Sequence, residues 1–263
     1  MGIVNVTPDS FSDGGRFLDC SAAVAHARRL IAEGADVLDI GGESTRPRAD
    51  PVAEDEEIAR VIPVIEAIRN ESSIQISVDT MKPAVARAAV AAGATMWNDV
   101  TALRFAPDSL ATAAELGCEV VLMHMQGEPR TMQAAPRYDD VVAEVAAFLA
   151  GRAEAAMAAG VARGRIWLDP GIGFGKTAAH SLALLRNLDR IVALGFPVLV
   201  GVSRKSAVAR IARDKSREDQ RLGGSIAAAL AAARAGAAML RVHDVAETRQ
   251  ALAIAAAIGQ AEA

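Results

Sequence analysis

Short apolar runs alternate with longer amphipathic segments along the whole chain. The apolar runs have the length of buried strands and occupy residues 2–6, 35–40, 74–79, 94–98, 119–124, 165–169, 197–202 and 238–242. Ala-rich segments with helical apolar spacing lie between them, at 21–33, 54–69, 83–92, 108–117, 139–159, 181–194, 219–235 and 245–258. Glycines that can end a helix precede several of the strands, for example Gly34 and Gly93. The pattern therefore predicts eight strand–helix units.

Strict alternation of strands and helices favours parallel strand pairing. Eight such units favour closure into a single (β/α)8 TIM barrel, an α/β fold, over the alternative of an open doubly wound sheet. No linker or composition change divides the chain, so we expect one domain over residues 1–263. The segments that follow the strands are the long ones, and such loops carry function at the carboxyl-terminal face of barrels.

The composition narrows the class of function. Hydrophobic residues make up 52% of the 263 positions and aromatics only 3%, so the chain can build a core but has few rings for stacking nucleic-acid bases. A net charge of −4 also argues against a general nucleic-acid or anionic-membrane binder. Cys20 and Cys118 lack metal or redox spacing, and no apolar run reaches the ~18 residues of a membrane span. We expect a cytoplasmic protein.

Charged residues close four of the apolar runs: Asp39, Asp79, Asp169 and Arg241. Packed strands have no reason to end in charges unless those ends share a solvated functional rim, which in a barrel holds the active site. The chain therefore reads as an enzyme.

The first two loops offer ligands for a cation and a phosphate. Asn5 ends the first strand, and Asp13 lies in the loop after it; their oxygens suit a hard cation such as Mg²⁺. A turn in which Asp and Ser bond their own backbone is the structural alternative. After the second strand, Thr45 and Arg46 can bind phosphate oxygens, unless Arg46 pairs locally with Glu43.

Asp79, Asn98 and Asp169 end the third, fourth and sixth strands. Together they could bind a planar heterocycle through its ring nitrogens and amine, or act as an acid/base pair in glycoside hydrolysis, which the scarcity of aromatics disfavours. Asp79 could instead cap the next helix. Residues 170–177 fail the phosphate-loop pattern because Pro170 stands where its first glycine is needed. We expect a flexible lip there, with Phe174 as an aromatic wall.

The last two strands end in basic residues. Ser203, Arg204, Lys205 and Ser206 follow the seventh strand, and Arg241 and His243 follow the eighth. The last two loops of such barrels often bind phosphate, although a solvated basic face is the alternative.

Seven of these stretches, in register over essentially the whole chain, resemble the dihydropteroate synthase family of pterin-binding enzymes. They are Met1–Phe11, Gly41–Pro47, Ser77–Thr80, Asn98–Asp99, Asp169–Lys176, Ser203–Ser206 and Arg241–Val245. The resemblance implies a transferase that condenses 6-hydroxymethyl-7,8-dihydropterin diphosphate with para-aminobenzoate to 7,8-dihydropteroate and diphosphate.

The resemblance also implies a role for each matching residue. Asn5 and Asp13 would bind Mg²⁺; Asp79, Asn98, Asp169 and Lys205 would hold the pterin; Thr45, Arg46, Arg241 and His243 would bind the diphosphate; Phe11, Pro47, Phe174 and Ser206 would line the para-aminobenzoate pocket. Catalysis would rest on Lys205, Asp169, Arg241 and His243. It further implies sulfonamide inhibitors and a homodimer through outer helices.

Two other functions remain open from the sequence. A methyltetrahydrofolate-binding methyltransferase uses a related barrel, but it needs no diphosphate site, which the Arg241 and His243 pair supplies here. A catalytically silent barrel with a binding role is the second alternative.

Overall fold

In this computed structural model, residues 1–6, 15–45, 49–205, 210 and 220–260 are described, with residues 15–19 as backbone alone. They contain eight strands, which are β1 (Gly2–Asn5), β2 (Val37–Gly41), β3 (Gln75–Asp79), β4 (Met96–Asp99), β5 (Glu119–Met123), β6 (Ile166–Asp169), β7 (Leu199–Gly201) and β8 (Met239–Arg241). All eight lie within the predicted runs or extend one residue beyond them, so the predicted strand pattern is confirmed.

The strands are parallel and close into a barrel. β1 to β6 pair in chain order, and β7 pairs with β8. Bridges from Leu168 to Val198 and from Gly2 to Val242 join the two sets at both edges. The amide of Ile3 donates to Val242 O at 3.1 Å, which ties the first strand to the last. The open doubly wound sheet is therefore excluded, and the (β/α)8 barrel is confirmed.

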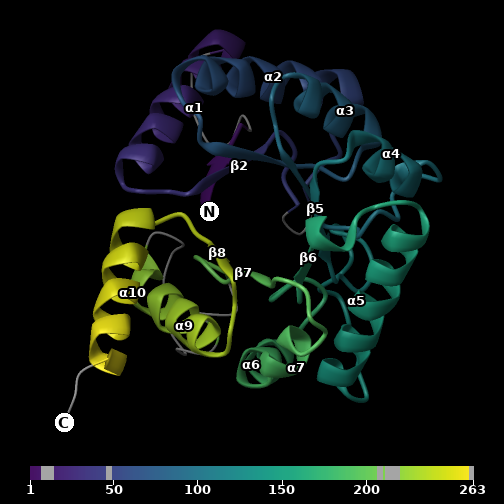
Figure 1. Ribbon diagram of the computed structural model, residues 1–263, viewed down its shortest axis with the longest axis vertical. Helices are drawn as coiled ribbons and strands as arrows, with labels where there is room; N and C mark the ends of the chain where they lie inside the picture. The colour runs from purple at the N-terminus through teal and green to yellow at the C-terminus, as the bar shows by residue number, and fades with distance from the viewer. Residues whose placement is uncertain (7–14, 46–48, 206–209, 211–219, 261–263) are drawn as a thin grey trace.

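Helices surround the strands as a ring (Figure 1). They are α1 (Gly15–Ala32), α2 (Glu54–Glu71), α3 (Pro83–Ala91), α4 (Ser109–Leu116), α5 (Val141–Ala158), α6 (Ala178–Arg186), α7 (Asp189–Val192), α9 (Leu222–Arg234) and α10 (Val245–Gln260). Two differ from the prediction. α1 begins at Gly15, earlier than expected, and the predicted helix 181–194 is split at Asn187. The Asn187 side chain donates to Ala183 O at 2.8 Å, and such local bonding competes with helix continuation.

Side chains alternate between two cores along each strand. Residues such as Leu38, Ile76 and Leu122 face the helices in the larger core. Met1, Val37, Met96, Val121 and Leu199 form a second, smaller cluster with Trp167 and Met239. These residues alternate in sequence with the helix-facing ones, so they fill the barrel interior. Apolar filling stops below Asp39, Asp79 and Asn98, which leaves the carboxyl-terminal end of the barrel polar.

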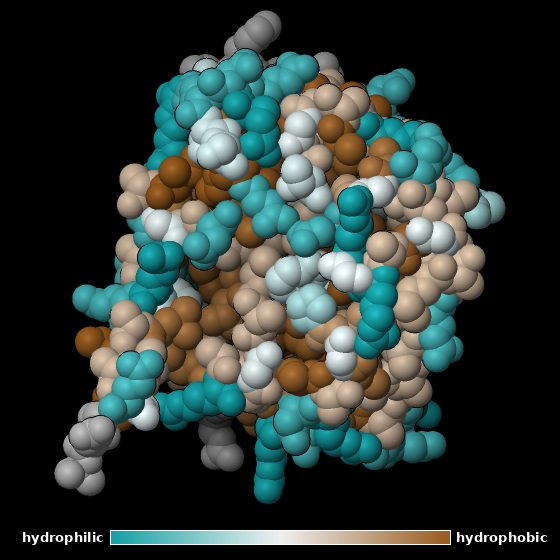
Figure 2. All heavy atoms as spheres, viewed as in Figure 1, coloured by the Kyte–Doolittle hydropathy of each residue, from teal (hydrophilic) through white to brown (hydrophobic). Residues whose placement is uncertain are grey.

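The outer surface is mixed. Figure 2 shows hydrophilic residues over much of one face and apolar residues gathered in a hollow near its middle. Among the helices that the structure describes, none is long and apolar enough to cross a membrane.

Candidate active site at the carboxyl-terminal rim

Strand register brings three of the predicted site residues, Asn5, Asp79 and Asn98, into one row with Gly41. Asn5 pairs with Gly41, Gly41 with Asp79, and Asp79 with Asn98. The residues are therefore successive neighbours across β1 to β4. Because parallel strands end at the same edge, separate sequence motifs are gathered on one rim.

Arg241, at the end of β8, reaches across the rim to residues of β2 and β3. Its Nε donates to Asp39 at 2.5 Å, and its Nη2 donates to Asp79 at 2.7 Å. Asn98 donates from Nδ2 to the same Asp39 oxygen at 3.2 Å. Asp79 accepts from Arg241, and α3 has no side-chain cap, so the capping alternative for Asp79 is wrong.

Asp39 is the site residue for which the sequence predicted no role. It is fully buried beneath the rim and connects Arg241 to Asn98. A charge inside an otherwise apolar strand was the available signal, because a buried carboxylate requires partners.

The charges at this cluster change the acidity of its members. Burial raises the pKa of Asp79 to about 7; the Arg241 charge opposes this shift, and the Asp39 charge adds to it. Burial alone would lower the pKa of Arg241, but Asp39 and Asp79 outweigh it and raise the pKa. Arg241 therefore stays a cation, and its side chain, only 20% exposed, is not part of a solvated basic face.

Lys205 and Asp169 form the second part of the site, at β6 and β7. The Lys205 ammonium donates to Ile172 O and lies 4.5 Å from the centre of the Phe174 ring. Burial lowers its pKa to about 8, and the charge of Asp169 opposes that shift. Asp169 accepts from the amide of Gly171 at 2.7 Å, and burial raises its pKa.

Gly201 shows how close the two cationic residues lie. A Cβ on Gly201 would be 3.8 Å from Lys205 Nζ and 3.7 Å from Arg241 Cβ. Lys205 and Arg241 therefore flank the same glycine at the ends of β7 and β8.

His243 is oriented by the neighbouring strand end. Its Nδ1 lies 2.9 Å from Ser203 Oγ, and its backbone amide donates to the same oxygen at 3.2 Å. Arg204 is committed elsewhere, since its Nε donates to Asp244 at 3.1 Å. The β7 and β8 ends thus present Lys205, Arg241 and His243, while Arg204 holds the two loops together.

The segment after β6 is anchored rather than a free lip. Gly171 and Gly175 have left-handed backbones, and a Cβ would be 1.9 Å from His124 O and 2.4 Å from Gln126 O, respectively. Only glycine permits this approach to the β5 end. Lys176, 2% exposed, lies 2.8 Å from His124 Nδ1 and donates to Phe174 O at 3.0 Å. Phe174 is thereby fixed beside Lys205, as a wall of the site.

Five predicted site residues lie outside the described residues: Phe11, Asp13, Arg46, Pro47 and Ser206. Thr45 is described and half-buried just after β2. Glu43, the alternative partner considered for Arg46, forms an ion pair with Lys82 at 2.5 Å.

Asn5 has the chemistry to bind an Mg²⁺ ion that would also be held by phosphate oxygens. Its neutral amide oxygen at the end of β1 suits a hard cation, and the rim beside it carries Asp79. No group of three or more acidic, histidine or cysteine side chains within the described ranges could hold a metal alone. Such a site matches the usual way Mg²⁺ is bound, by one or two protein ligands together with substrate phosphates.

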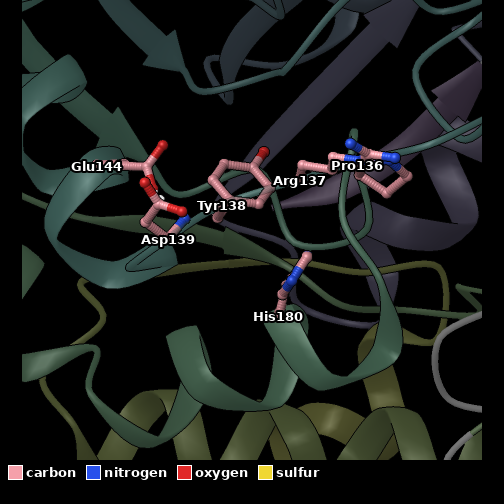
Figure 3. A pocket seen from close by; sticks show the side chains of 6 residues that line it. All are labelled: Pro136, Arg137, Tyr138, Asp139, Glu144 and His180. Carbon is pink, nitrogen blue, oxygen red and sulfur yellow. Dashed lines mark hydrogen bonds between the residues drawn. The ribbon is translucent and has the colours of Figure 1, made fainter.

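A pocket of about 540 Å³ lies outside this cluster, on the loop between β5 and α5 (Figure 3). Arg137, Tyr138 and Glu144 line it, with His180 from α6. Tyr138 donates to Gly175 O at 2.8 Å, and its ring meets His180 edge-on at 5.0 Å. The pocket therefore lies on the outer side of the contact by which Tyr138 anchors the β6–α6 segment, and it is separate from the cluster of charged residues at the rim.

Comparison with known proteins agrees with this geometry. Residues 1–243 match the family described as pterin binding enzyme. A dihydropteroate synthase of Haemophilus influenzae is 48% identical over 97% of this chain and 91% of its own length.

Two solved structures share the fold closely. A Xanthomonas albilineans dihydropteroate synthase with 4-aminobenzoic acid is 54% identical, with a TM-score of 0.93 over 99% of this chain and 93% of that one. A Yersinia pestis dihydropteroate synthase in a sulfonamide drug complex is 46% identical, with a TM-score of 0.93 over 99% and 94%. The chain therefore belongs to the pterin-binding enzyme family, among its dihydropteroate synthases.

Proposed function

We propose that this chain condenses 6-hydroxymethyl-7,8-dihydropterin diphosphate with para-aminobenzoate, giving 7,8-dihydropteroate and diphosphate. The observation that carries the proposal is the contact of Arg241 with Asp79 at 2.7 Å, with Lys205 beside the same glycine, Gly201, as Arg241. A cation suited to a departing diphosphate thus adjoins carboxylates suited to a pterin.

The pterin would bind to Asp79, Asn98, Asp169 and Lys205. The ring N–H groups and the exocyclic amine of a pterin donate hydrogen bonds, which the carboxylates and the Asn98 amide oxygen can accept. The ring carbonyl can accept a hydrogen bond from Lys205. Burial strengthens each of these bonds because the local dielectric is low. The same buried groups reject ligands that leave them unpaired.

The leaving diphosphate would be bound by Arg241 and His243, assisted by Thr45 and Arg46. The C–O bond breaks with its electron pair going to the diphosphate oxygen, and the electron-rich pterin supports the resulting cationic methylene. The lone pair of the arylamine nitrogen then forms the new C–N bond, and that nitrogen loses a proton. One well-aimed contact to the developing charge is worth roughly 3 kcal/mol, or ~10²-fold in rate.

Mg²⁺ would be held by Asn5, with Asp13 as a second ligand, and would supply charge to the diphosphate oxygens. Phe11, Pro47, Phe174 and Ser206 would line the para-aminobenzoate pocket. The sulfonamide complex of the Yersinia pestis relative supports the same ligand class here. A homodimer through outer helices and a cytoplasmic location stay predictions.

Diphosphate release separates this function from its alternatives. The protein is incubated with pterin diphosphate and Mg²⁺, with and without para-aminobenzoate, and both products are quantified. We expect equal amounts of diphosphate and 7,8-dihydropteroate, both dependent on para-aminobenzoate. Absence of any turnover would indicate a silent barrel, and methyl transfer from methyltetrahydrofolate would indicate the methyltransferase.

A further inference from the structure

One buried ammonium holds both ends of the segment that follows β2. Lys82, 6% exposed, donates from Nζ to Glu43 at 2.5 Å and to the backbone oxygen of Val52 at 2.6 Å. Glu43 lies two residues after the end of β2, and Val52 lies two residues before the start of α2. Glu43 and Val52 are therefore held by a single side chain from another strand–helix unit.

A third bond attaches this ammonium to the body of α2. Lys82 also donates to Glu57 at 2.6 Å, and Glu57 is fully buried. Burial alone would lower the pKa of Lys82, but the hydrogen bonds and charges of Glu43 and Glu57 outweigh it and raise the pKa. Lys82 therefore stays a cation beside both carboxylates.

The turn that carries Lys82 is itself fixed to the active-site strand. The backbone amide of Lys82 donates to Thr80 Oγ1 at 3.2 Å, and the buried Trp97 donates from Nε1 to Thr80 O at 2.7 Å. Thr80 directly follows Asp79. The position of Lys82 is thereby linked to the position of Asp79.

An apolar side chain would hold such a turn at lower cost. Bringing an ammonium and two carboxylates out of water costs several kcal/mol per ion, and apolar replacements of buried pairs are often neutral or stabilising. What a buried ion pair supplies instead is a defined relative geometry. Here that geometry relates Thr45, two residues after Glu43, to Asp79.

We propose that Lys82 is a positioning residue for the reaction, which fixes Glu43 so that Thr45, two residues further on, meets the diphosphate while Asp79 holds the pterin. The inference rests on the proposed function, since it needs Thr45 to bind the diphosphate. Lys82 itself touches neither substrate.

Two carboxylates on the same ammonium provide a matched test. Glu43→Ala removes the bond to the segment, whereas Glu57→Ala removes the bond to α2 and leaves Glu43 and Val52 in place. We expect Glu43→Ala to raise KM for pterin diphosphate about tenfold with kcat within threefold, which corresponds to ~1.4 kcal/mol of binding. We expect Glu57→Ala to lower Tm while KM stays within twofold of wild type.

Lys82 itself supplies the rescue experiment. Lys82→Met removes all three bonds and should raise KM at least as much as Glu43→Ala, whereas Lys82→Arg keeps a charged donor and should restore much of the loss. If Glu57→Ala does not fold, Glu57→Gln takes its place. Folding is checked by thermal unfolding of each variant.

The outcomes separate the two proposals. An active wild type with unchanged KM in Glu43→Ala would overturn the positioning role. Equal KM increases in the Glu43 and Glu57 variants would also overturn it, because the effect would then follow cluster charge and not the segment. A wild type that releases no diphosphate would count against the proposed function instead.

Discussion

Arg241 and Asp39 lie 202 positions apart in the chain, yet Arg241 Nε donates to Asp39 at 2.5 Å. The contact joins the last strand of the barrel to the second across its interior. Asp39 also accepts from Asn98, so it aligns a residue proposed for the diphosphate with one proposed for the pterin.

Asp39→Asn should therefore lower both stability and turnover. The substitution keeps the shape but removes the charge that pairs with Arg241, and losing one partner of a buried bond costs about 1–3 kcal/mol. Chemical unfolding and steady-state kinetics measure the two effects. Asp36→Asn is the control, because its side chain is 86% exposed and should change stability by less than about 0.5 kcal/mol.

Lys205→Ala and Asp169→Asn should reduce turnover roughly 10²-fold each while the protein stays folded. Lys205 is proposed to bind the pterin carbonyl. The Asn side chain at position 169 can still accept from the Gly171 amide, which limits the structural effect. Turnover is measured at saturating substrates beside circular dichroism; wild-type rates in either variant would show that the pterin assignment is wrong.

Turnover should also fall as pH rises above about 8. Burial lowers the pKa of Lys205 to about 8, so its ammonium loses a proton there and no longer supplies charge to the pterin. Lys205→Arg stays charged and should move this limb to higher pH. A kcat/KM profile of both proteins checks the assignment, and coincident limbs would contradict it.

The same pKa shift has a consequence for folding. The ordinary pKa of 10.5 applies in the unfolded chain, so between about pH 8 and 10.5 the unfolded state binds more protons than the folded state. The contribution of Lys205 to the unfolding free energy is therefore unfavourable below about pH 8 and improves as pH rises through this window. The unfolding free energy of wild type minus that of Lys205→Met should therefore increase as pH rises from about 8 to about 10.5.

Gly171→Ala should destabilise the protein by about 1–3 kcal/mol. Gly171 has a φ of +64°, and its Cβ would meet His124 O at 1.9 Å, so backbone would have to move. Gly151→Ala, the same change within α5 with nothing within 4 Å, should instead stabilise by roughly 0.5–1 kcal/mol. Chemical unfolding compares the two, and similar values would contradict the close approach.

Much of the fold was predictable because its signals are local. The apolar runs and terminal glycines give each strand–helix unit, and the unit count gives closure. Charged strand ends, such as Asp79 and Arg241, gave the location of the site for the same reason. The split at Asn187 was not predictable from apolar spacing, since it depends on a side-chain bond to Ala183.

The sequence could not show which side chains contact one another across the fold. Asp39, Lys82 and Lys176 acquire their roles from contacts with residues far away in the chain, such as Arg241, Glu43 and His124. A charge in an apolar strand signals that a partner exists, but only the folded arrangement identifies it.

The structure of the protein with pterin diphosphate and Mg²⁺ tests the proposed site most directly. We expect the pterin within hydrogen-bond distance of Asp79, Asn98 and Lys205, and the diphosphate against Arg241 and His243 beside Asn5. A diphosphate bound away from the ends of β1 and β8 would contradict this arrangement.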